Sequence, residues 1–341
     1  MKQRQTILFL TRLYHPHIGG VEKHVYFLSQ MLIKKGYKVV VVTEQFDSHL
    51  SLTDTHDGIE IFRIPVGSNS SLKKFLIWRW VLAHQDLFLK AQIIHIHDVF
   101  FWILPLRLFL PKGKIFTTFH GYEGYPIKKK WIFVRKITEY LSSGTICIGD
   151  FMRKWYKAAP TYVSYGGARS SDVIAPKNDQ SAVFFGRFES QTGIIEYVKA
   201  FKEIKKKYPR FKLTIVGDGP LRSKLPHNVT YMDFEPNIEH LISRYRFIFV
   251  SRYLSMLEAI VQKKEVIAVF SDPIKKDYLE MSPFKEYVSI AKNASEIAKC
   301  VDVSLENGPN KRKIEAGYAW AKQNSWEKVL NTYFLLWGIT K

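Results

Sequence analysis

The chain has 341 residues, which exceeds the usual size of one domain and favours two. Hydrophobic residues make up 46% and charged residues 24%, so the composition is that of a globular protein and excludes a largely disordered chain. The formal net charge of +20 indicates an anionic partner, which is a nucleic acid, an anionic lipid surface or a phosphate-bearing small substrate.

Strands and helices alternate through residues 1–163, which predicts a mostly parallel sheet covered by helices. The predicted strands are 6–10, 39–43, 59–64, 92–96, 114–119, 144–148 and 161–164. The predicted helices are 21–35, 72–90, 100–109, 130–142 and 150–157. Residues 164–180 are rich in Gly, Ser, Pro, Asn and Asp, without apolar periodicity, and predict a linker.

A second alternating series begins with a strand at 182–188. The further strands are expected at 212–217, 229–232, 247–251 and 265–270, and the helices at 193–207, 220–224, 237–244, 254–262, 275–281 and 294–305. Ser325 is the N-cap candidate of a closing helix. We therefore predict an α/β protein with an N-terminal domain at 1–165, a C-terminal domain at 166–322, and a helix at 323–341 that packs back towards the first domain.

The turn between the first strand and the first helix contains two glycines, Gly19 and Gly20. Backbone N–H groups at such a turn, together with the helix dipole, form a site for a phosphate or another anion. The alternative is an ordinary tight turn between a strand and a helix.

Lys and Arg are interleaved with Trp, Phe and Leu in three segments, 72–90, 104–114 and 125–141. This composition is typical of helices that lie in a membrane interface, and also of core-facing helices whose outer face is basic. Because three segments share the pattern, we favour an anionic membrane surface. No helix-turn-helix, zinc-finger or RNP-type signature is present, so no specific nucleic acid is expected as a partner.

The two cysteines, Cys147 and Cys300, lie far apart without C-x-x-C spacing, so we expect reduced thiols in the cytoplasm and no zinc site. The first apolar run, 7–10, is short and soon followed by Arg12, which is not typical of a secretory signal. No stretch reaches the roughly 18 apolar residues of a membrane-spanning helix, so we do not expect an integral membrane protein. From the three basic aromatic segments we expect a cytoplasmic protein peripheral to the inner face of the cytoplasmic membrane.

Several motifs follow one another in a recognisable order. They are HPHIGGVEKH in the first turn, IIHIHD (93–98), TTFHG (117–121), ICIGDFMRKWY (146–156), FFGRFESQTGI (184–194), LTIVGDGP (213–220), LSMLEAI (254–260), EVIA (265–268) and SWEKV (325–329). In this order the chain resembles glycosyltransferase family 4, the retaining nucleotide-sugar enzymes with the GT-B fold. The resemblance covers nearly the whole chain and implies two Rossmann-like, doubly wound domains that face each other across a cleft.

The resemblance implies roles for individual residues. Gly19 and Gly20 would lie under the donor diphosphate, where the absence of a Cβ lets the backbone approach. His120, at the carboxyl end of a strand, would contact the donor sugar and help to stabilise the transition state. Arg187 would bind the diphosphate and neutralise the leaving group. Glu258 would hold the ribose of the nucleotide.

The backbone N–H groups of Ser255, Met256 and Leu257 would bind the donor phosphates. His95, His97 and Asp98, at the end of the neighbouring strand, are interpreted as supporting residues at the sheet edge. Because the two histidines share one face without a further ligand, neither a metal nor another cofactor is expected.

Two positions depart from the family pattern. Thr192 stands where the pattern GR-x4-KG has its lysine, so the diphosphate site would lose one positive charge. The residue eight positions before Glu258 is Val250, not the first glutamate of the Glu-x7-Glu pair, because the intervening loop is shorter. Arg252 occupies the shortened turn, where it would compensate for Thr192 or bind an anionic group of the donor.

The sequence therefore predicts transfer of a sugar from a nucleoside-diphosphate sugar to a membrane-linked or polysaccharide acceptor, with retention of anomeric configuration. Two alternatives follow from the departures: a non-catalytic or weakly active partner in glycan assembly, and a GT-B nucleotide-sugar epimerase. A nucleic-acid-binding protein is supported by charge alone. A dinucleotide-dependent oxidoreductase is disfavoured because the first turn reads HIGGVE, not GxGxxG.

Overall fold

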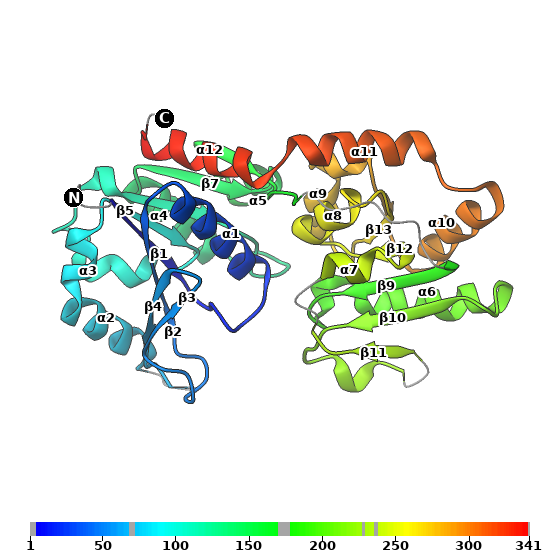
Figure 1. Cartoon of the computed structure of the whole chain (residues 1–341), viewed down its shortest axis with the longest axis horizontal. Helices are drawn as coiled ribbons and strands as arrows, with labels where there is room; N and C mark the ends of the chain where they lie inside the picture. Colours follow the sequence, from blue (N-terminus) through cyan, green and yellow to red (C-terminus); the bar gives the residue numbers. More distant parts are fainter. Residues whose placement is uncertain (1–4, 68–71, 170–177, 227–228, 235–237, 340–341) are drawn as a thin grey trace. The chain divides into compact units, whose positions relative to one another are not determined.

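A computed structural model gives the fold and describes residues 5–67, 72–169, 178–226, 229–234 and 238–339 (Figure 1). The contacts divide the chain into two compact units, which we call unit 1 (1–164 and 326–341) and unit 2 (165–325). The boundaries expected from the sequence, 165/166 and 322/323, lie near these divisions. Each unit is described by itself.

Unit 1 is built on an eight-stranded sheet in the order β3-β4-β2-β1-β5-β6-β7-β8. All neighbouring strands pair in parallel except β3 and β4, which form an antiparallel hairpin. The strands are β1 (Thr6–Thr11), β2 (Lys38–Glu44), β3 (Thr53–His56), β4 (Ile59–Ile64), β5 (Ile93–His97), β6 (Ile115–Phe119), β7 (Gly144–Ile148) and β8 (Tyr162–Ser164).

Helices cover both faces of this sheet, as expected for parallel strands joined by crossovers (Figure 1). The α-helices are α1 (Gly20–Lys34), α2 (Lys73–Ala83), α3 (Gln85–Lys90), α4 (Lys129–Leu141), α5 (Phe151–Tyr156) and α12 (Trp326–Trp337). Two 3₁₀ helices are η1 (Phe100–Leu106) and η2 (Lys112–Lys114). The apolar runs of β1 and β2 reflect burial on both faces of the sheet, and β5 (IIHIH) is fully buried as well, including its two histidines.

The helix α12 belongs to unit 1 although it follows all of unit 2 in the sequence. It packs on α1, β7 and β8. Its side chains Tyr333 and Trp337 are buried against residues of β5 and β6.

Unit 2 is built on a six-stranded, wholly parallel sheet in the order β11-β10-β9-β12-β13-β14. The strands are β9 (Asn178–Phe185), β10 (Lys212–Val216), β11 (Thr230–Met232), β12 (Tyr245–Phe249), β13 (Glu265–Val269) and β14 (Ser289–Ala291). The α-helices are α6 (Ile194–Lys207), α7 (Ile238–Ile242), α8 (Tyr253–Ile260), α9 (Pro273–Glu280), α10 (Ala294–Asn307) and α11 (Lys311–Gln323). The 3₁₀ helices are η3 (Ser190–Thr192), η4 (Arg222–Lys224) and η5 (Pro283–Glu286). The two described units are both doubly wound α/β sheets, as the sequence predicts.

Three predicted helices are wrong in detail. The one expected at 220–224 is only the short 3₁₀ helix η4. The helix expected at 72–90 is divided at His84, whose Nδ1 contacts the carbonyl oxygen of Trp80 at 2.9 Å and whose ring stacks on the Trp80 ring. The helix expected at 100–109 is the 3₁₀ helix η1, which contains Pro105. Proline has no N–H to continue an α-helical ladder.

The strands β3 and β14 and the helix α11 have no counterpart in the sequence prediction. β3 carries no alternation of apolar residues, but Asp57 and Gly58, both at positive φ, form the two-residue hairpin turn that joins it to β4. The Asp-Gly pair is therefore the signal that identifies this strand. Residues 170–177 of the predicted linker at 164–180 lie outside the described residues, and β9 begins at Asn178, before the expected start at 182.

Candidate active site

The carboxyl ends of β1, β5 and β6, which are neighbours in the sheet of unit 1, carry the first group of candidate residues. The loop after β1 leads through Gly19 into α1, β5 ends at His97, and His120 follows β6 directly. The ring of His24, in the second turn of α1, lies 4.9 Å from the ring of His120, edge to face. The structure therefore brings the start of α1 and His120 together.

The two glycines of the first loop differ in their surroundings. A Cβ on Gly19 would lie 2.4 Å from Oε2 of Glu22, whereas nothing lies within 4 Å of a Cβ on Gly20. Glu22 occupies the third position of α1, and its carboxylate lies over the start of the helix. Its Oε1 also lies 2.8 Å from Nδ1 of His17. The space at Gly19 is thus filled by a carboxylate of this chain, and the open backbone is at Gly20.

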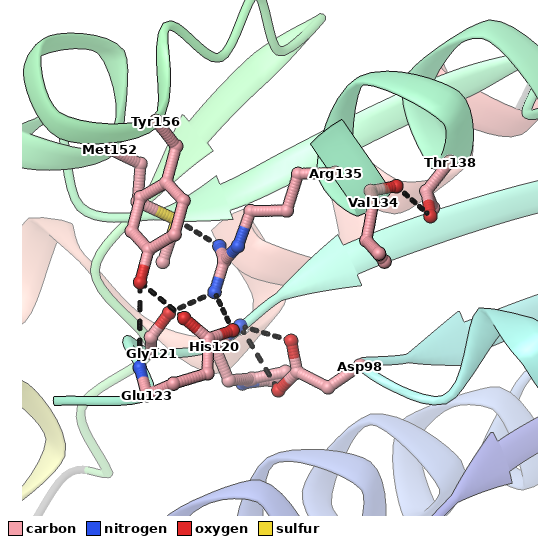
Figure 2. A network of polar contacts seen from close by, with 9 residues as sticks. All are labelled: Asp98, His120, Gly121, Glu123, Val134, Arg135, Thr138, Met152 and Tyr156. Carbon is pink, nitrogen blue, oxygen red and sulfur yellow. Dashed lines mark hydrogen bonds and ion pairs between the residues drawn. The ribbon is translucent and has the colours of Figure 1, made fainter. Parts of the chain in front are cut away.

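His120 is partly exposed, and both its backbone and its ring are held by residues of the β5 end. Its N–H is donated to the carboxylate of Asp98, at 3.1 and 3.3 Å from the two oxygens, as Figure 2 shows. Its Nε2 lies 2.7 Å from Nδ1 of His97. These contacts of His97 and Asp98 with His120 are consistent with the supporting role that the sequence suggests for both residues.

Next to His97 and His120 lies a network of buried polar side chains. The indole N–H of Trp337 can only donate, so Nδ1 of His95 accepts it at 2.9 Å and Nε2 of His95 carries the ring proton. That Nε2 donates to Oγ1 of Thr118 at 2.7 Å. The hydroxyl of Tyr333 lies 2.9 Å from the same Oγ1 and 2.8 Å from Nε2 of His24. The network therefore ties α12 to the strands β5 and β6.

Burial keeps the imidazoles of this region neutral. It lowers the pKa of His24, His95 and His97 well below the ordinary value of 6.5, with the neighbouring histidine rings as a second cause. Burial, and next the proximity of His95, lower the pKa of His120 to about 3. At neutral pH these rings can orient and share hydrogen bonds, but they carry no positive charge.

Arg187 lies in the loop that follows β9 in unit 2. Its side chain is 47% exposed, and its guanidinium NH1 lies 3.5 Å from Oε1 of Glu189. A second loop packs against this one, because a Cβ on Gly217 would lie 2.3 Å from the carbonyl oxygen of Gly186. Gly217 is at positive φ as well, so glycine is required there.

Thr192, at the position of the family lysine, is buried within the same loop. Its hydroxyl contacts the carbonyl oxygens of Arg187, at 2.9 Å, and of Glu189, at 2.7 Å. It stabilises the turn η3 and does not extend a polar group outward. Arg252 approaches this loop from the turn before α8, where its NH2 donates to Oε1 of Gln191 at 2.9 Å.

The shortened turn at 251–253 is rigidly packed. The N–H of Tyr253 is donated to the hydroxyl of Tyr278 at 2.9 Å, and the two rings stack at 3.9 Å. The hydroxyl of Ser251 accepts the N–H of Val269 at 2.9 Å. The amine of Lys275, which is buried so that its pKa is lowered, donates to the carbonyl oxygen of Ser251. The backbone that carries Arg252 is thus fixed from several sides.

The helix α8 begins at Tyr253, earlier than the sequence suggests. The N–H of Met256 is already bonded to the carbonyl oxygen of Arg252 at 2.9 Å, and Leu257 lies one residue further into the helix. Of the three residues expected to offer N–H groups to phosphates, only Ser255 lies in the first turn, where N–H groups have no partner within the helix. Glu258 lies in the second turn and is 7% exposed.

Sequence reasoning missed Tyr333, Trp337 and His24 as parts of the first group. Tyr333 and Trp337 are separated from their partners by more than 200 positions, so no local pattern could connect them. His24 lies in the quoted first motif, and its position one turn after Gly20 was the available signal. Within the described parts of the chain, no group of three or more His, Cys, Asp or Glu residues is placed to hold a metal ion.

Comparison with known families decides the classification. Residues 18–162 match the family described as Glycosyltransferase Family 4, and residues 170–317 match the family described as Glycosyl transferases group 1. The chain belongs to the family 4 glycosyltransferases of the GT-B fold. The two matches follow the order of the two units and together account for most of the chain.

Curated relatives of this family 4 glycosyltransferase include a subunit of phosphatidylinositol N-acetylglucosaminyltransferase from two organisms. The Arabidopsis thaliana protein is 22% identical over 284 residues (75% of this chain, 62% of the relative), and the human protein 30% identical over 239 residues (63% and 48%). A GDP-mannose:cellobiosyl-diphosphopolyprenol alpha-mannosyltransferase of Xanthomonas oryzae is 24% identical over 234 residues (62% and 60%). The chain thus spans about three fifths of the length of the Arabidopsis and Xanthomonas proteins and about half of the length of the human protein.

Solved structures share the fold at low identity. A sucrose-phosphate synthase from Thermosynechococcus elongatus has a TM-score of 0.76 and 16% identity, covering 98% of both chains. The Anabaena protein Alr3699/HepE, in complex with UDP and glucose, has a TM-score of 0.69 and 15% identity, covering 97% of this chain and 98% of the other. Glycosyltransferases of the GT-B fold are thus its structural neighbours.

Proposed function

We propose that this glycosyltransferase moves a sugar from a nucleoside-diphosphate sugar to a lipid-linked or polysaccharide acceptor, with retention of anomeric configuration, at the inner face of the cytoplasmic membrane. The proposed location at a membrane is supported by the outer surface of unit 1. In the described residues, most of the large apolar side chains exposed to solvent lie in the three segments 72–90, 104–114 and 125–141. We call these segments the basic aromatic surface.

The exposed apolar side chains of this surface stand among lysines and arginines. They are Leu72, Phe75, Leu82, Leu89, Leu104, Leu108, Phe109, Tyr125, Phe133, Val134, Ile137 and Tyr140. Apolar side chains enter the boundary between headgroups and acyl chains, and cations are attracted to the anionic cytoplasmic leaflet. No described helix is long and apolar enough to cross a bilayer. The composition supports binding to a membrane surface.

The three segments are joined to one another in the structure. Nζ of Lys114 donates to the carbonyl oxygen of Leu89 at the end of the first segment at 3.5 Å. Nε of Arg107, just after η1, donates to the carbonyl oxygen of Leu141 at the end of α4 at 3.1 Å. Nζ of Lys112 lies 5.3 Å from the centre of the Tyr140 ring. The basic aromatic surface is therefore one connected part of unit 1.

The names of the relatives support a lipid acceptor. One relative is named for transfer of N-acetylglucosamine to phosphatidylinositol, and another for transfer of mannose to a diphosphopolyprenol-linked cellobiose. The Anabaena protein Alr3699/HepE has also been solved in complex with UDP-glucose. We therefore propose a UDP- or GDP-sugar as donor and a lipid-linked saccharide or phosphoinositide-like lipid as acceptor.

We assign the chemical roles as follows. Arg187 binds the diphosphate and offsets the negative charge that develops as the glycosidic bond breaks. Arg252, which contacts the Arg187 loop through Gln191, supplies the second cation in place of the missing lysine. His120 contacts the transferred sugar as a neutral hydrogen-bonding ring. No metal or other cofactor is included in this proposal.

Transfer is tested with a panel of UDP- and GDP-sugars and lipid-linked acceptors, with product configuration determined by NMR. The wild type should give one labelled product of retained configuration with one donor, and His120→Ala should lower kcat about a hundredfold. Absence of product with every donor, or product from an acceptor-free epimerisation, would contradict the proposal.

Membrane binding is tested by co-sedimentation with vesicles of phosphatidylcholine containing phosphatidylglycerol or lacking it. Phe133→Ser should reduce partitioning to anionic vesicles about tenfold, because a phenylalanine contributes about 1.5–3 kcal/mol when buried. Leu335→Ser is the matched control, since Leu335 is 68% and Phe133 66% exposed and Leu335 lies outside the surface. Equal binding of both variants, or binding that is independent of salt, would refute the membrane assignment.

A second candidate is a non-catalytic or weakly active partner in glycan assembly. It is favoured by Thr192, whose hydroxyl is turned inward where the family has a lysine. Titration calorimetry with UDP and GDP separates the two candidates, because a catalytic donor site binds one of them and a pure assembly partner binds neither.

A further inference from the structure

The helix α4 has two unlike faces. Its outer face carries Phe133, 66% exposed, and Tyr140, 76% exposed, both in the basic aromatic surface. Its inner face carries Arg135, which is 6% exposed, and Thr138, which is 2% exposed. A buried arginine on a surface helix requires an explanation, because removing its charge from water is expensive unless every donor finds a partner.

The partners of Arg135 lie in the segment that follows His120. Figure 2 shows its guanidinium between the helix α5 and this segment. NH2 donates to the carbonyl oxygen of Gly121 at 2.5 Å and lies 3.0 Å from Oε1 of Glu123, while NH1 contacts Sδ of Met152 at 3.3 Å. The guanidinium also lies over the ring of Tyr156, 3.9 Å from its centre. The hydroxyl of Tyr156 donates to the other carboxylate oxygen of Glu123, which completes the cluster.

The segment 120–128, all of which is described, lies outside helices and strands. Its backbone is therefore held by side chains instead of by a hydrogen-bonded ladder. Asp98 accepts the N–H of His120, and Arg135 donates to the carbonyl oxygen of Gly121, the next residue. These two side chains hold adjacent residues from two different elements, the end of β5 and the inner face of α4.

An apolar side chain could fill the position of Arg135 with similar or greater stability, because well-packed apolar residues commonly replace buried ion pairs without loss. An apolar side chain could not donate to the Gly121 carbonyl or hold Glu123. The guanidinium fork is suited to both at once, since its donors are fixed in one plane. The contacts of Arg135 thus define the path of the backbone after His120.

We infer that Arg135 is a positioning residue for His120, which fixes the loop behind this histidine so that its ring meets the transferred sugar in the reactive orientation. The inference rests on the proposed function for the role of His120. Arg135 itself touches neither donor nor acceptor in this proposal. Its loss should therefore lower kcat and leave donor binding unchanged.

The test uses the full chain with Arg135→Lys, which keeps the charge and removes the fork. We expect kcat to fall about ten- to a hundredfold, since a small misplacement of a reacting group has effects of that size, while the KM for the donor stays within about twofold. Hydrogen exchange of the backbone at 120–123 should become faster. Arg246→Lys is the matched control, because Arg246 is another largely buried arginine, paired with Glu265 in unit 2.

Two further variants keep the inference falsifiable if Arg135→Lys does not fold. Tyr156→Phe removes the hydroxyl that holds Glu123 and keeps the ring under the guanidinium, and Glu123→Gln removes the charge. Each should lower kcat by a smaller factor and speed exchange at 120–123. The inference would be overturned if the variants that fold had the kcat of the wild type and also its rate of hydrogen exchange at 120–123.

Hydrogen exchange does not depend on transfer, so the two proposals can fail separately. If the wild type transfers no sugar but exchange at 120–123 rises in Arg135→Lys alone, the proposed function fails and Arg135 still fixes the loop. If the wild type is active and Arg135→Lys equals Arg246→Lys in kcat and in exchange, the inference fails and the proposed function stands.

Discussion

The two units hold their candidate side chains in opposite ways. In unit 1, His24, His95 and His97 are buried and neutral. His24 and His95 are joined by hydrogen bonds through Tyr333 and Thr118, while His97 is bonded to His120 and contacts the other two rings. In unit 2, Arg187 is half exposed on a loop and Arg252 is only partly buried beside Gln191. A neutral network can fix the direction of a ring but supplies no charge, whereas an exposed guanidinium supplies charge and is less firmly fixed. We therefore expect substitutions in unit 1 to change geometry and stability, and those in unit 2 to change electrostatics.

The largest effect should come from Arg187→Ala. Loss of a guanidinium that offsets the charge on the leaving diphosphate should lower kcat/KM about a hundred- to a thousandfold. Because the side chain is half exposed, the midpoint of denaturant unfolding should stay unchanged. Steady-state kinetics with labelled donor, and urea unfolding, measure the two quantities.

The control for this substitution is Arg210→Ala, which removes an exposed arginine between α6 and β10 of the same unit. Equal activity of the two variants would contradict the charge role of unit 2. A large loss of stability in Arg187→Ala would contradict the division of roles between the units.

A pH effect should follow from the buried histidines of unit 1. Their folded-state pKa values lie well below 6.5, so below about pH 6.5 the unfolded state binds protons that the folded state does not. The free energy of unfolding should fall as the pH is lowered from there, by up to about 1.4 kcal/mol per pH unit for each histidine. His97→Gln should make this slope shallower by up to that amount.

Urea unfolding at several pH values between 7 and about 5 measures this slope. His49→Gln is the control, because His49 is exposed on the loop after β2. If His97→Gln and His49→Gln share one pH profile, the burial of His97 does not contribute to acid sensitivity, and the contrast between the units would be weaker than the contacts indicate.

The smallest effect should come from Arg252→Ala. Removing a second, partly buried cation at the diphosphate should weaken binding of UDP or GDP about fivefold, or about 1 kcal/mol, which is the net contribution of a typical hydrogen bond. Arg252→Lys should retain most of the affinity. Titration calorimetry gives the constants, and unchanged affinity in Arg252→Ala would remove Arg252 from the donor site.

The sequence predicts those parts of the fold that arise from local patterns. The apolar runs of β1 and β2 are long enough to identify buried parallel strands, and the spacing in α1 identifies its core-facing side. Helix α11 was missed because it packs through small residues, with Gly317 against Tyr287 and Ile260, instead of through a broad apolar stripe. The division between α2 and α3 at His84 depends on the contact of His84 with Trp80, which helix propensity does not reveal.

The candidate site is less predictable because it depends on contacts between distant segments. His120 and Arg187 could be selected because each follows a strand, and Asp98 because it ends the motif at the neighbouring strand. The ring of His95, however, receives its hydrogen bond from Trp337, 242 positions away. Arg135 lies in a segment that looks only basic and aromatic in the sequence, and its inward direction is set by the packing of α4.

The position of α12 has a consequence for how the protein is made. Unit 1 is interrupted in the sequence by all of unit 2, and Tyr333 and Trp337 complete the hydrogen bonds of Thr118, His24 and His95. Domains generally fold as units during synthesis, N-terminal parts first. Here the ribosome must release Trp337 before the first domain can close, so unit 2 is free to fold before unit 1 is complete. A released chain that ends at residue 325 should therefore hold a protease-resistant second unit and a protease-sensitive first one.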